Sequence, residues 1–97
     1  MPSPVFLLTQ NYPNPFNPET TIPFSLAAQG MVSLEVFDLL GRRIDILVND
    51  LLPAGTYSRT WHAAKIPSGI YFYRLSAFSE NDRQILFTQT KTLTLVK

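Results

Sequence analysis

Side chains that commonly carry out catalysis or bind metals are few in this chain, and they are not grouped. His62 is the only histidine and cysteine is absent, which excludes disulfides, thiolate metal sites and a thiol nucleophile. A transition-metal site would have to rest on carboxylates, and the seven Asp and Glu residues are dispersed without the spacing of a calcium-binding loop. The sequence therefore predicts no metal site, and we expect His62 to be an exposed loop residue.

The sequence also lacks the motifs of nucleophilic and phosphate chemistry. It contains no glycine-rich phosphate loop, and Ser68 lies in a predicted turn without the flanking glycines of a nucleophile elbow. Because an active site needs reactive groups that converge, we predict a protein that is not an enzyme and that uses no cofactor.

The aromatic side chains allow two interpretations. Four of them could form a flat platform on which a sugar ring stacks, as in small carbohydrate-binding modules: Tyr57, Trp61, Tyr71 and Tyr73. Twelve aromatic residues in a chain of 97 are explained first by filling of the core, because each ring buries a large apolar area. We favour the core and keep a carbohydrate- or surface-binding module as an alternative.

Charge and hydropathy limit the possible partners. A net charge of +1 gives no reason to expect nucleic acid or an anionic membrane surface as a partner. Four of the five arginines are spread over different predicted strands and form no obvious basic patch: Arg42, Arg43, Arg59 and Arg74. No apolar run approaches the ~18 residues needed to span a bilayer.

Residues 1–10 read as the end of a linker followed by a possible edge strand. Met1-Pro2-Ser3-Pro4 has neither the basic start nor the apolar segment of a secretory signal peptide, and Val5–Leu8 is a short apolar run. We expect residues 11–97 to form one domain.

Most of that domain alternates apolar and polar residues, the pattern of half-buried strands. Ile22, Phe24 and Leu26 share one face of the first clear strand, and Pro23 between them indicates an edge strand or an outward, unpaired position. The cleanest alternation, over Met31–Asp38, predicts a strand near the centre of the core. Further strands are expected over Arg43–Val48 (with Ile44, Ile46 and Val48 on one face), Thr56–Trp61, Ile70–Phe78 and Gln84–Lys97, the last either continuous or broken by a bulge near Gln89-Thr90.

Turn residues separate these strands. Asp38–Arg42 reads as a tight hairpin, with Asp38 capping the turn and Gly41 at a left-handed position. Asn49-Asp50, Pro53–Gly55 and Pro67–Gly69 are further predicted turns. About seven short antiparallel strands without a helix predict an all-β, immunoglobulin-like β-sandwich, with a small barrel as the alternative.

The segment Asn11–Pro18, Asn-Tyr-Pro-Asn-Pro-Phe-Asn-Pro, is here called the proline strip. Its three prolines exclude a helix and hold the segment extended or turned. Tyr12 and Phe16 are too apolar for a free linker, so we expect both side chains to clamp the strip against the sandwich.

Taken together, these motifs resemble the type IX secretion system type A C-terminal sorting domain, found in Bacteroidetes. The resemblance covers roughly residues 8–97 and rests on the proline strip, Val36-Phe37-Asp38 with Gly41-Arg42, Ala54-Gly55, Trp61, Ser68-Gly69-Ile70-Tyr71 and a terminal Lys97. The positions that it marks as sorting-motif residues are Asn14, Pro15, Phe16, Asp38, Gly41, Arg42, Ser68, Gly69, Tyr71, Lys91, Leu93, Leu95 and Lys97.

The resemblance implies a folded label that follows a cargo domain. Cargo of this kind reaches the periplasm by the general secretory route and is passed to the cell surface or beyond by the outer-membrane translocon. A sortase-like cysteine protease usually removes the label. We expect the edge of the final strand to be accessible to a partner strand. A structural spacer, or a scaffold-assembly role like that of related sandwiches in flagellar hook-capping proteins, is the alternative to a sorting signal.

Overall fold

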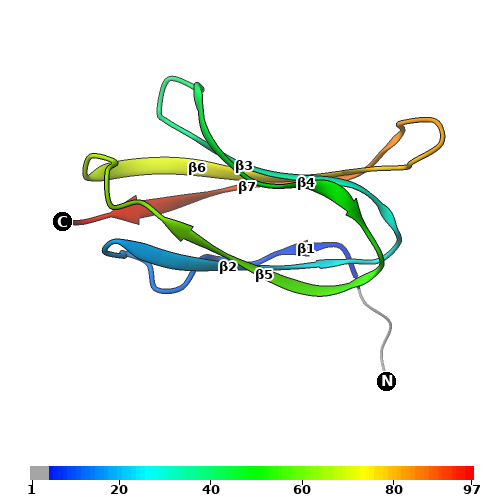
Figure 1. The fold of residues 1–97 in the computed structure, drawn as a ribbon, viewed down its shortest axis with the longest axis horizontal. Helices are drawn as coiled ribbons and strands as arrows, with labels where there is room; N and C mark the ends of the chain where they lie inside the picture. The colour runs from blue at the N-terminus through cyan, green and yellow to red at the C-terminus, as the bar shows by residue number, and fades with distance from the viewer. Residues whose placement is uncertain (1–4) are drawn as a thin grey trace.

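Residues 5–97 are described by a computed structural model in which seven antiparallel strands form two facing sheets (Figure 1). The strands are β1 (Leu7–Leu8), β2 (Glu19–Leu26), β3 (Gly30–Phe37), β4 (Arg43–Leu52), β5 (Gly55–His62), β6 (Gly69–Phe78) and β7 (Ile85–Leu95). The expected linker end at residues 1–4 lies outside the described residues. From residue 5 onward, the fold includes no helix that is long and apolar enough to cross a membrane.

Strand order confirms the predicted sandwich. One sheet has the order β1-β2-β5 and the other β4-β3-β6-β7. In an immunoglobulin-like fold the first, second and fifth strands likewise share a sheet, and the third, sixth and seventh share the other. Because the two sheets are separate, the chain is a sandwich rather than a small barrel.

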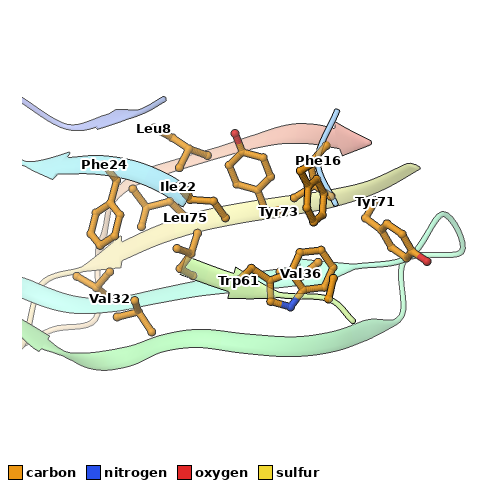
Figure 2. Packing of buried hydrophobic residues seen from close by; sticks show 14 of the residues in the cluster. Leu8, Phe16, Ile22, Phe24, Val32, Val36, Trp61, Tyr71, Tyr73 and Leu75 are labelled. Atoms are coloured by element: carbon orange, nitrogen blue, oxygen red, sulfur yellow. The ribbon is translucent and has the colours of Figure 1, made fainter. Parts of the chain in front are cut away.

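The core lies between the sheets, and the strands contribute alternate residues to it, as expected for half-buried strands. Ile22, Phe24 and Leu26 of β2 are buried, as are Val32, Leu34 and Val36 of β3 and Tyr71, Tyr73, Leu75 and Ala77 of β6. Figure 2 shows side chains from both sheets meeting in this layer. Every second residue is buried because successive side chains of a β-strand point to opposite faces of the sheet.

The prediction for β4 is wrong in two places. Ile46 is 43% exposed, although the alternation placed it inward with Ile44 and Val48. The cause is a β-bulge. Leu34 pairs with Val48 and Glu35 with Ile46, so Leu47 is an extra residue in β4, and Ile46 therefore points to the opposite face of the sheet from the one predicted. The predicted turn at Asn49-Asp50 is also not formed, since both residues pair with β3.

Of the two alternatives predicted for Pro23, the unpaired position is the one present. β2 is the middle strand of its sheet, not an edge strand. The Pro23 carbonyl nevertheless faces away from β5, since it accepts the N–H of Thr9 (3.1 Å). The missing N–H of Pro23 therefore points to the side where β1 has just ended, and the pairing of β2 with β5 is intact.

β7 is one continuous strand at the edge of the four-stranded sheet, so the first of the two predicted forms is the one present. The register shift between β6 and β7 lies at Ala77/Phe78, next to the connecting loop, and not near Gln89-Thr90. Val5 accepts a hydrogen bond from Ser25, at the end of the sandwich opposite to the C-terminus (Figure 1).

Candidate functional site

Most of the sorting-motif residues come together at one end of the sandwich, here called the motif end. It is formed by the β3–β4 hairpin, the β5–β6 turn, the proline strip and the C-terminal end of β7, segments that are far apart in the sequence (Figure 1). A surface depression at this end is lined by Asp38, Leu39, Leu40, Arg42, Ser68, Gly69, Ile70 and Tyr71. Lys91 is the exception, because it lies within β7 opposite Tyr73.

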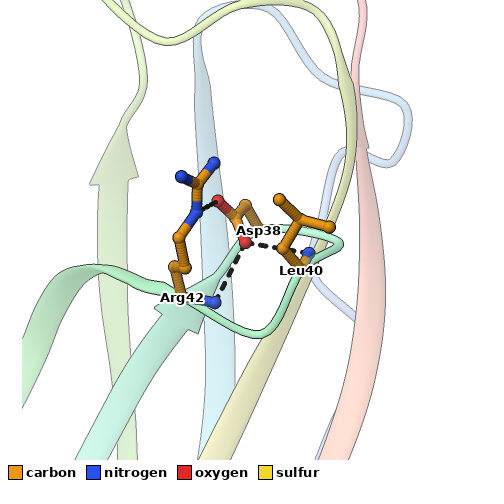
Figure 3. A network of polar contacts seen from close by, with 3 residues as sticks. All are labelled: Asp38, Leu40 and Arg42. Atoms are coloured by element: carbon orange, nitrogen blue, oxygen red, sulfur yellow. Dashed lines mark hydrogen bonds and ion pairs between the residues drawn. The ribbon is translucent and has the colours of Figure 1, made fainter.

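The β3–β4 hairpin is held by Asp38 in the way that the sequence predicts. One carboxylate oxygen accepts the N–H groups of Leu40 (2.9 Å) and Arg42 (3.0 Å), and the other accepts Nε of Arg42 (2.8 Å; Figure 3). The backbone N–H of Arg42 is the main cause that lowers the pKa of Asp38, so the carboxylate is ionised at neutral pH. Gly41 takes a φ of 81°, which favours glycine.

The hairpin presents two leucines to solvent. Leu39 and Leu40 are 62% and 78% exposed at its tip, and Ile70 beside them is 48% exposed. None of the three was predicted as a functional residue. The sequence did contain a signal for Leu39 and Leu40. The predicted turn depends on Asp38 and Gly41, so two large apolar residues at its tip are not explained by folding.

The β5–β6 turn joins three predicted residues to the C-terminus. Tyr71 is buried, donates its hydroxyl to the Pro67 carbonyl and meets the Trp61 ring edge-on at 6.0 Å. Burial, and after it the charge of Asp38, raises the pKa of the Tyr71 hydroxyl. Ser68 Oγ accepts the backbone N–H of Lys97 (3.0 Å). Gly69, with a φ of 158°, allows the chain to turn into β6.

The proline strip runs beside the outer edge of β7. The N–H of Phe16 donates to the Thr94 carbonyl, and the N–H of Val96 donates to the Phe16 carbonyl, each at 3.0 Å. Asn14 Oδ1 accepts the N–H of Thr94 (2.9 Å), and the Gln10 side chain donates to the Thr92 carbonyl (2.7 Å). The terminal part of the β7 edge is therefore already paired within the chain.

The prediction that two side chains clamp the proline strip is confirmed for Phe16 and is wrong for Tyr12. Phe16 is 2% exposed, and its ring lies 5.8 Å from that of Trp61. Tyr12 is 78% exposed, and only its backbone holds the strip, through two hydrogen bonds with Thr21. The other anchor, which the sequence did not indicate, is the buried hydroxyl of Tyr73: it donates to the Thr9 carbonyl (2.8 Å) and accepts the Asn11 N–H (2.9 Å).

Burial and local role divide most of the predicted residues into three groups, while Gly69 and Lys91 are half-buried. Phe16, Tyr71, Leu93 and Leu95 are buried and serve the fold. Asp38 and Gly41 shape the hairpin. The exposed members, which are available for contact with a partner, are Asn14, Pro15, Arg42, Ser68 and Lys97.

The proposed sugar platform is not formed. Trp61 is 1% exposed, and its indole N–H donates to the carboxylate of Asp45 in β4 (2.9 Å). Tyr71 and Tyr73 are buried as well, so core filling is the correct interpretation of these rings. His62 is exposed, but it is the last residue of β5 and pairs with Glu19 at 2.6 Å. Between residues 5 and 97 there is no group of three potential metal ligands.

The family model described as "Secretion system C-terminal sorting domain" matches residues 10–87. The matched range includes the proline strip, the hairpin and the β5–β6 turn, and it ends within β7. Lys91, Leu93, Leu95 and Lys97 lie beyond it. No curated protein matches the chain.

Proposed function

Because the chain belongs to the family of secretion system C-terminal sorting domains, we propose that it is a folded label that the outer-membrane type IX translocon recognises on an upstream cargo. The cargo is passed from the periplasm to the cell surface or the exterior. A sortase-like protease then removes the label. In this proposal the domain is a substrate of the machinery and performs no catalysis, and residues 11–97 are the part that is read.

The observation that carries the proposal is the gathering of exposed motif residues at one end of a rigid sandwich. The β3–β4 hairpin and the β5–β6 turn line one depression there, and the apolar tip of the hairpin extends from the same surface. Exposed leucines cost solubility without adding to the core, so contact with a partner is the simplest reason for their presence. We propose that the translocon reads Leu39, Leu40 and Arg42 as part of this surface.

Recognition through side chains is favoured over strand addition at the C-terminus. The outer edge of β7 from Thr92 to Val96 is occupied by Gln10, Asn14 and Phe16, so an added strand would first have to displace the proline strip. The open part of that edge, around Thr88 and Thr90, lies away from the motif end.

An export assay tests the recognition surface. Residues 1–97 are fused to a periplasmic reporter in a host with a type IX system, and surface-exposed reporter is measured for wild type, Leu39→Ser/Leu40→Ser and Ile85→Ser. Ile85 is 62% exposed and serves as the matched control, because it begins β7 and so lies at the end of that strand opposite to Leu95. We expect the double variant to lower export at least ~10-fold with an unchanged melting temperature, since both leucines lack core contacts.

Equal export of all three fusions would contradict reading of the motif end. It would favour the spacer interpretation, in which only a stable fold matters. Removal of the label is tested separately in a host without the sortase-like protease. There the exported fusion should stay heavier by the mass of the domain, at most 11.0 kDa, and processing that continues in that host would contradict this step.

A further inference from the structure

The charged side chains that face inward in the seven strands all belong to edge strands. The two sheet orders make β4, β5 and β7 edges, whereas β2, β3 and β6 are inner strands. Paired residues of neighbouring strands share a face of the sheet. Four charged residues pair with a buried residue and therefore face inward: Asp45, Asp50, Arg59 and Lys91. Within residues 5–97, the inward positions of the inner strands are uncharged.

Three of these four charges lie on one side of the sandwich. The edges of β4, which carries Asp45 and Asp50, and of β5, which carries Arg59, lie beside each other there, and we call this the β4–β5 side. The indole N–H of Trp61 donates to Asp45 (2.9 Å) and so connects the two edges. Both aspartates are exposed and Arg59 is half-buried, because side chains at the rim of the sandwich still reach water.

The two aspartates occupy backbone donors of their own strand. Asp45 accepts the N–H of Ile46 (2.8 Å), and Asp50 accepts the N–H of Leu51 (2.9 Å). An edge strand normally presents such N–H groups to any further strand that pairs with it. The Ile46 and Leu51 donors are therefore already satisfied within β4.

Arg59 does the same for a backbone acceptor of β5. Ser58 lies opposite Pro23, whose carbonyl faces away from β5 because it accepts the N–H of Thr9 (3.1 Å). Since this pair does not exchange hydrogen bonds, the Ser58 carbonyl points to the free edge. Arg59 donates to that carbonyl (2.9 Å). The guanidinium thus covers a group that an added strand would need.

Without these charges, both edges would be well suited to pair with another strand. Residues 56–61, Thr-Tyr-Ser-Arg-Thr-Trp, are rich in β-branched and aromatic types, and Arg59 is their single charge. Residues 44–48, Ile-Asp-Ile-Leu-Val, likewise have Asp45 as their single charge. Short segments of this composition tend to pair edge to edge unless a charge or a proline interrupts them.

We propose that Asp45, Asp50 and Arg59 close the β4–β5 side to strand addition by a second copy of this chain and so keep the domain monomeric. A copy added at either edge would continue the sheet and take the inward charges out of water. Pairing of β4 with β4, or of β5 with β5, would also place like charges on one shared edge.

Contact of β4 with β5 of another copy would match opposite charges, but only after the side chains had released the backbone groups that they occupy. The proposal rests on the fold alone and does not depend on the proposed function.

Removal of the charges tests the proposal, with self-association measured by light scattering over a concentration series. Asp50→Thr/Arg59→Thr removes one acid and one base, and Asp45 is kept because it also holds Trp61. Glu80→Thr/Lys65→Thr makes the same change of charge at exposed turn positions. We expect the first pair to lower the dissociation constant of self-association at least ~10-fold relative to wild type, and the second to leave it unchanged. If the first pair stayed as monomeric as wild type, or both pairs associated equally, the proposal would be overturned.

Amide hydrogen exchange locates the contact and distinguishes association from unfolding. In concentrated samples of the first pair, the Leu51 and Ser58 amides should exchange more slowly than in dilute samples, while Thr88 and Thr90 on β7 should not change. Slowing at Thr88 and Thr90 alone would place the contact on β7 and overturn the proposal. If the pair unfolds, Asp50→Thr alone, at an exposed position, should still lower the dissociation constant at least ~3-fold, and a monomeric single variant would overturn the proposal.

Discussion

At the scale of single residues, Tyr73 has a role that its place in an apolar alternation does not reveal. Thr9 lies opposite Pro23, which cannot return the hydrogen bond that an antiparallel pair would otherwise make. The hydroxyl of Tyr73, which belongs to β6 of the other sheet, donates to the Thr9 carbonyl instead. The Tyr73 hydroxyl thus replaces the hydrogen bond that Pro23, which has no N–H, cannot donate to Thr9.

Removal of this hydroxyl should be costly. Tyr73→Phe leaves the Thr9 carbonyl and the Asn11 N–H without a partner at a site where the ring is fully buried. We expect the free energy of unfolding to fall by about 2–4 kcal/mol in urea titrations. Tyr57→Phe is the matched control, because its hydroxyl donates to Pro53 at an exposed position, and it should cost about 1 kcal/mol or less. Equal losses would contradict the assigned role.

The same hydroxyl makes stability depend on alkaline pH. Burial raises the pKa of Tyr73 to about 12, against a slight lowering by the Asn11 N–H. Because the folded pKa lies above the unfolded value near 10, this contribution is complete below pH 10 and is lost as the pH rises toward 12. Between pH 9 and 11, wild type should lose about 1.4 kcal/mol more than Tyr73→Phe. Parallel pH profiles would contradict the shift.

At the scale of elements, the proline strip joins the two sheets. It pairs with β2 through Tyr12, with β7 through Phe16 and with the core through the Phe16 ring. Between Thr9 and Tyr12 the chain has one residue more than the facing part of β2, which turns the Asn11 N–H inward to Tyr73. Sequence reading identified the strip as rigid and anchored, but not which strand it covers, because partner choice depends on contacts distant in sequence.

Asn14 and Asn17 allow a matched test of that cover. Both precede a proline, but only the Asn14 side chain accepts the N–H of Thr94. Asn14→Ala should speed hydrogen exchange at the Thr94 amide at least ~10-fold and cost about 1 kcal/mol of global stability. Asn17→Ala should leave exchange at Thr94 unchanged. If the Thr94 amide stayed protected from hydrogen exchange in both variants, the proline strip would cover β7 without the Asn14 side chain.

The strands themselves show where sequence reading succeeds and where it fails. Alternation predicted β2, β3 and β6 because nothing interrupts the two-residue period on their inner faces. It failed at Ile46, where the bulge at Leu47 shifts the period by one, and such an insertion leaves no mark in composition. Asn49-Asp50 was predicted as a turn because both residue types favour turns. No turn forms there because both residues pair with β3, and this pairing overrides their local preference.

At the scale of the whole molecule, the last strand is needed for folding. Leu93 and Leu95 are fully buried between the sheets, and Tyr71 pairs with Leu93. Deletion of Lys91–Lys97 should therefore unfold the domain, with loss of dispersed amide signals in NMR spectra. Deletion of Lys97 alone removes one exposed residue and should leave the spectrum folded. If the chain without Lys91–Lys97 stayed folded, this assignment would be wrong, and the end of β7 could act as a signal that the fold does not need.

The candidate site was predicted as a set of positions but not as a surface. The resemblance identified Asp38, Arg42, Ser68 and Tyr71, and the fold brings them to one end. It did not identify Leu39 or Leu40. Two leucines at the tip of a predicted turn were a signal in the sequence, but their exposure of 62% and 78% is seen only in the folded chain. Motifs mark what the family shares, whereas solvent exposure belongs to the folded chain.

The parallel pairing of Phe16 with Leu95 has a mechanical consequence. Val5 and the C-terminus lie at opposite ends of the sandwich, and the strip and β7 run in the same direction (Figure 1). Tension applied between the two ends would pull these neighbours past one another. The hydrogen bonds made by Asn14, Phe16 and Val96 would then be strained together in shear rather than opened one at a time.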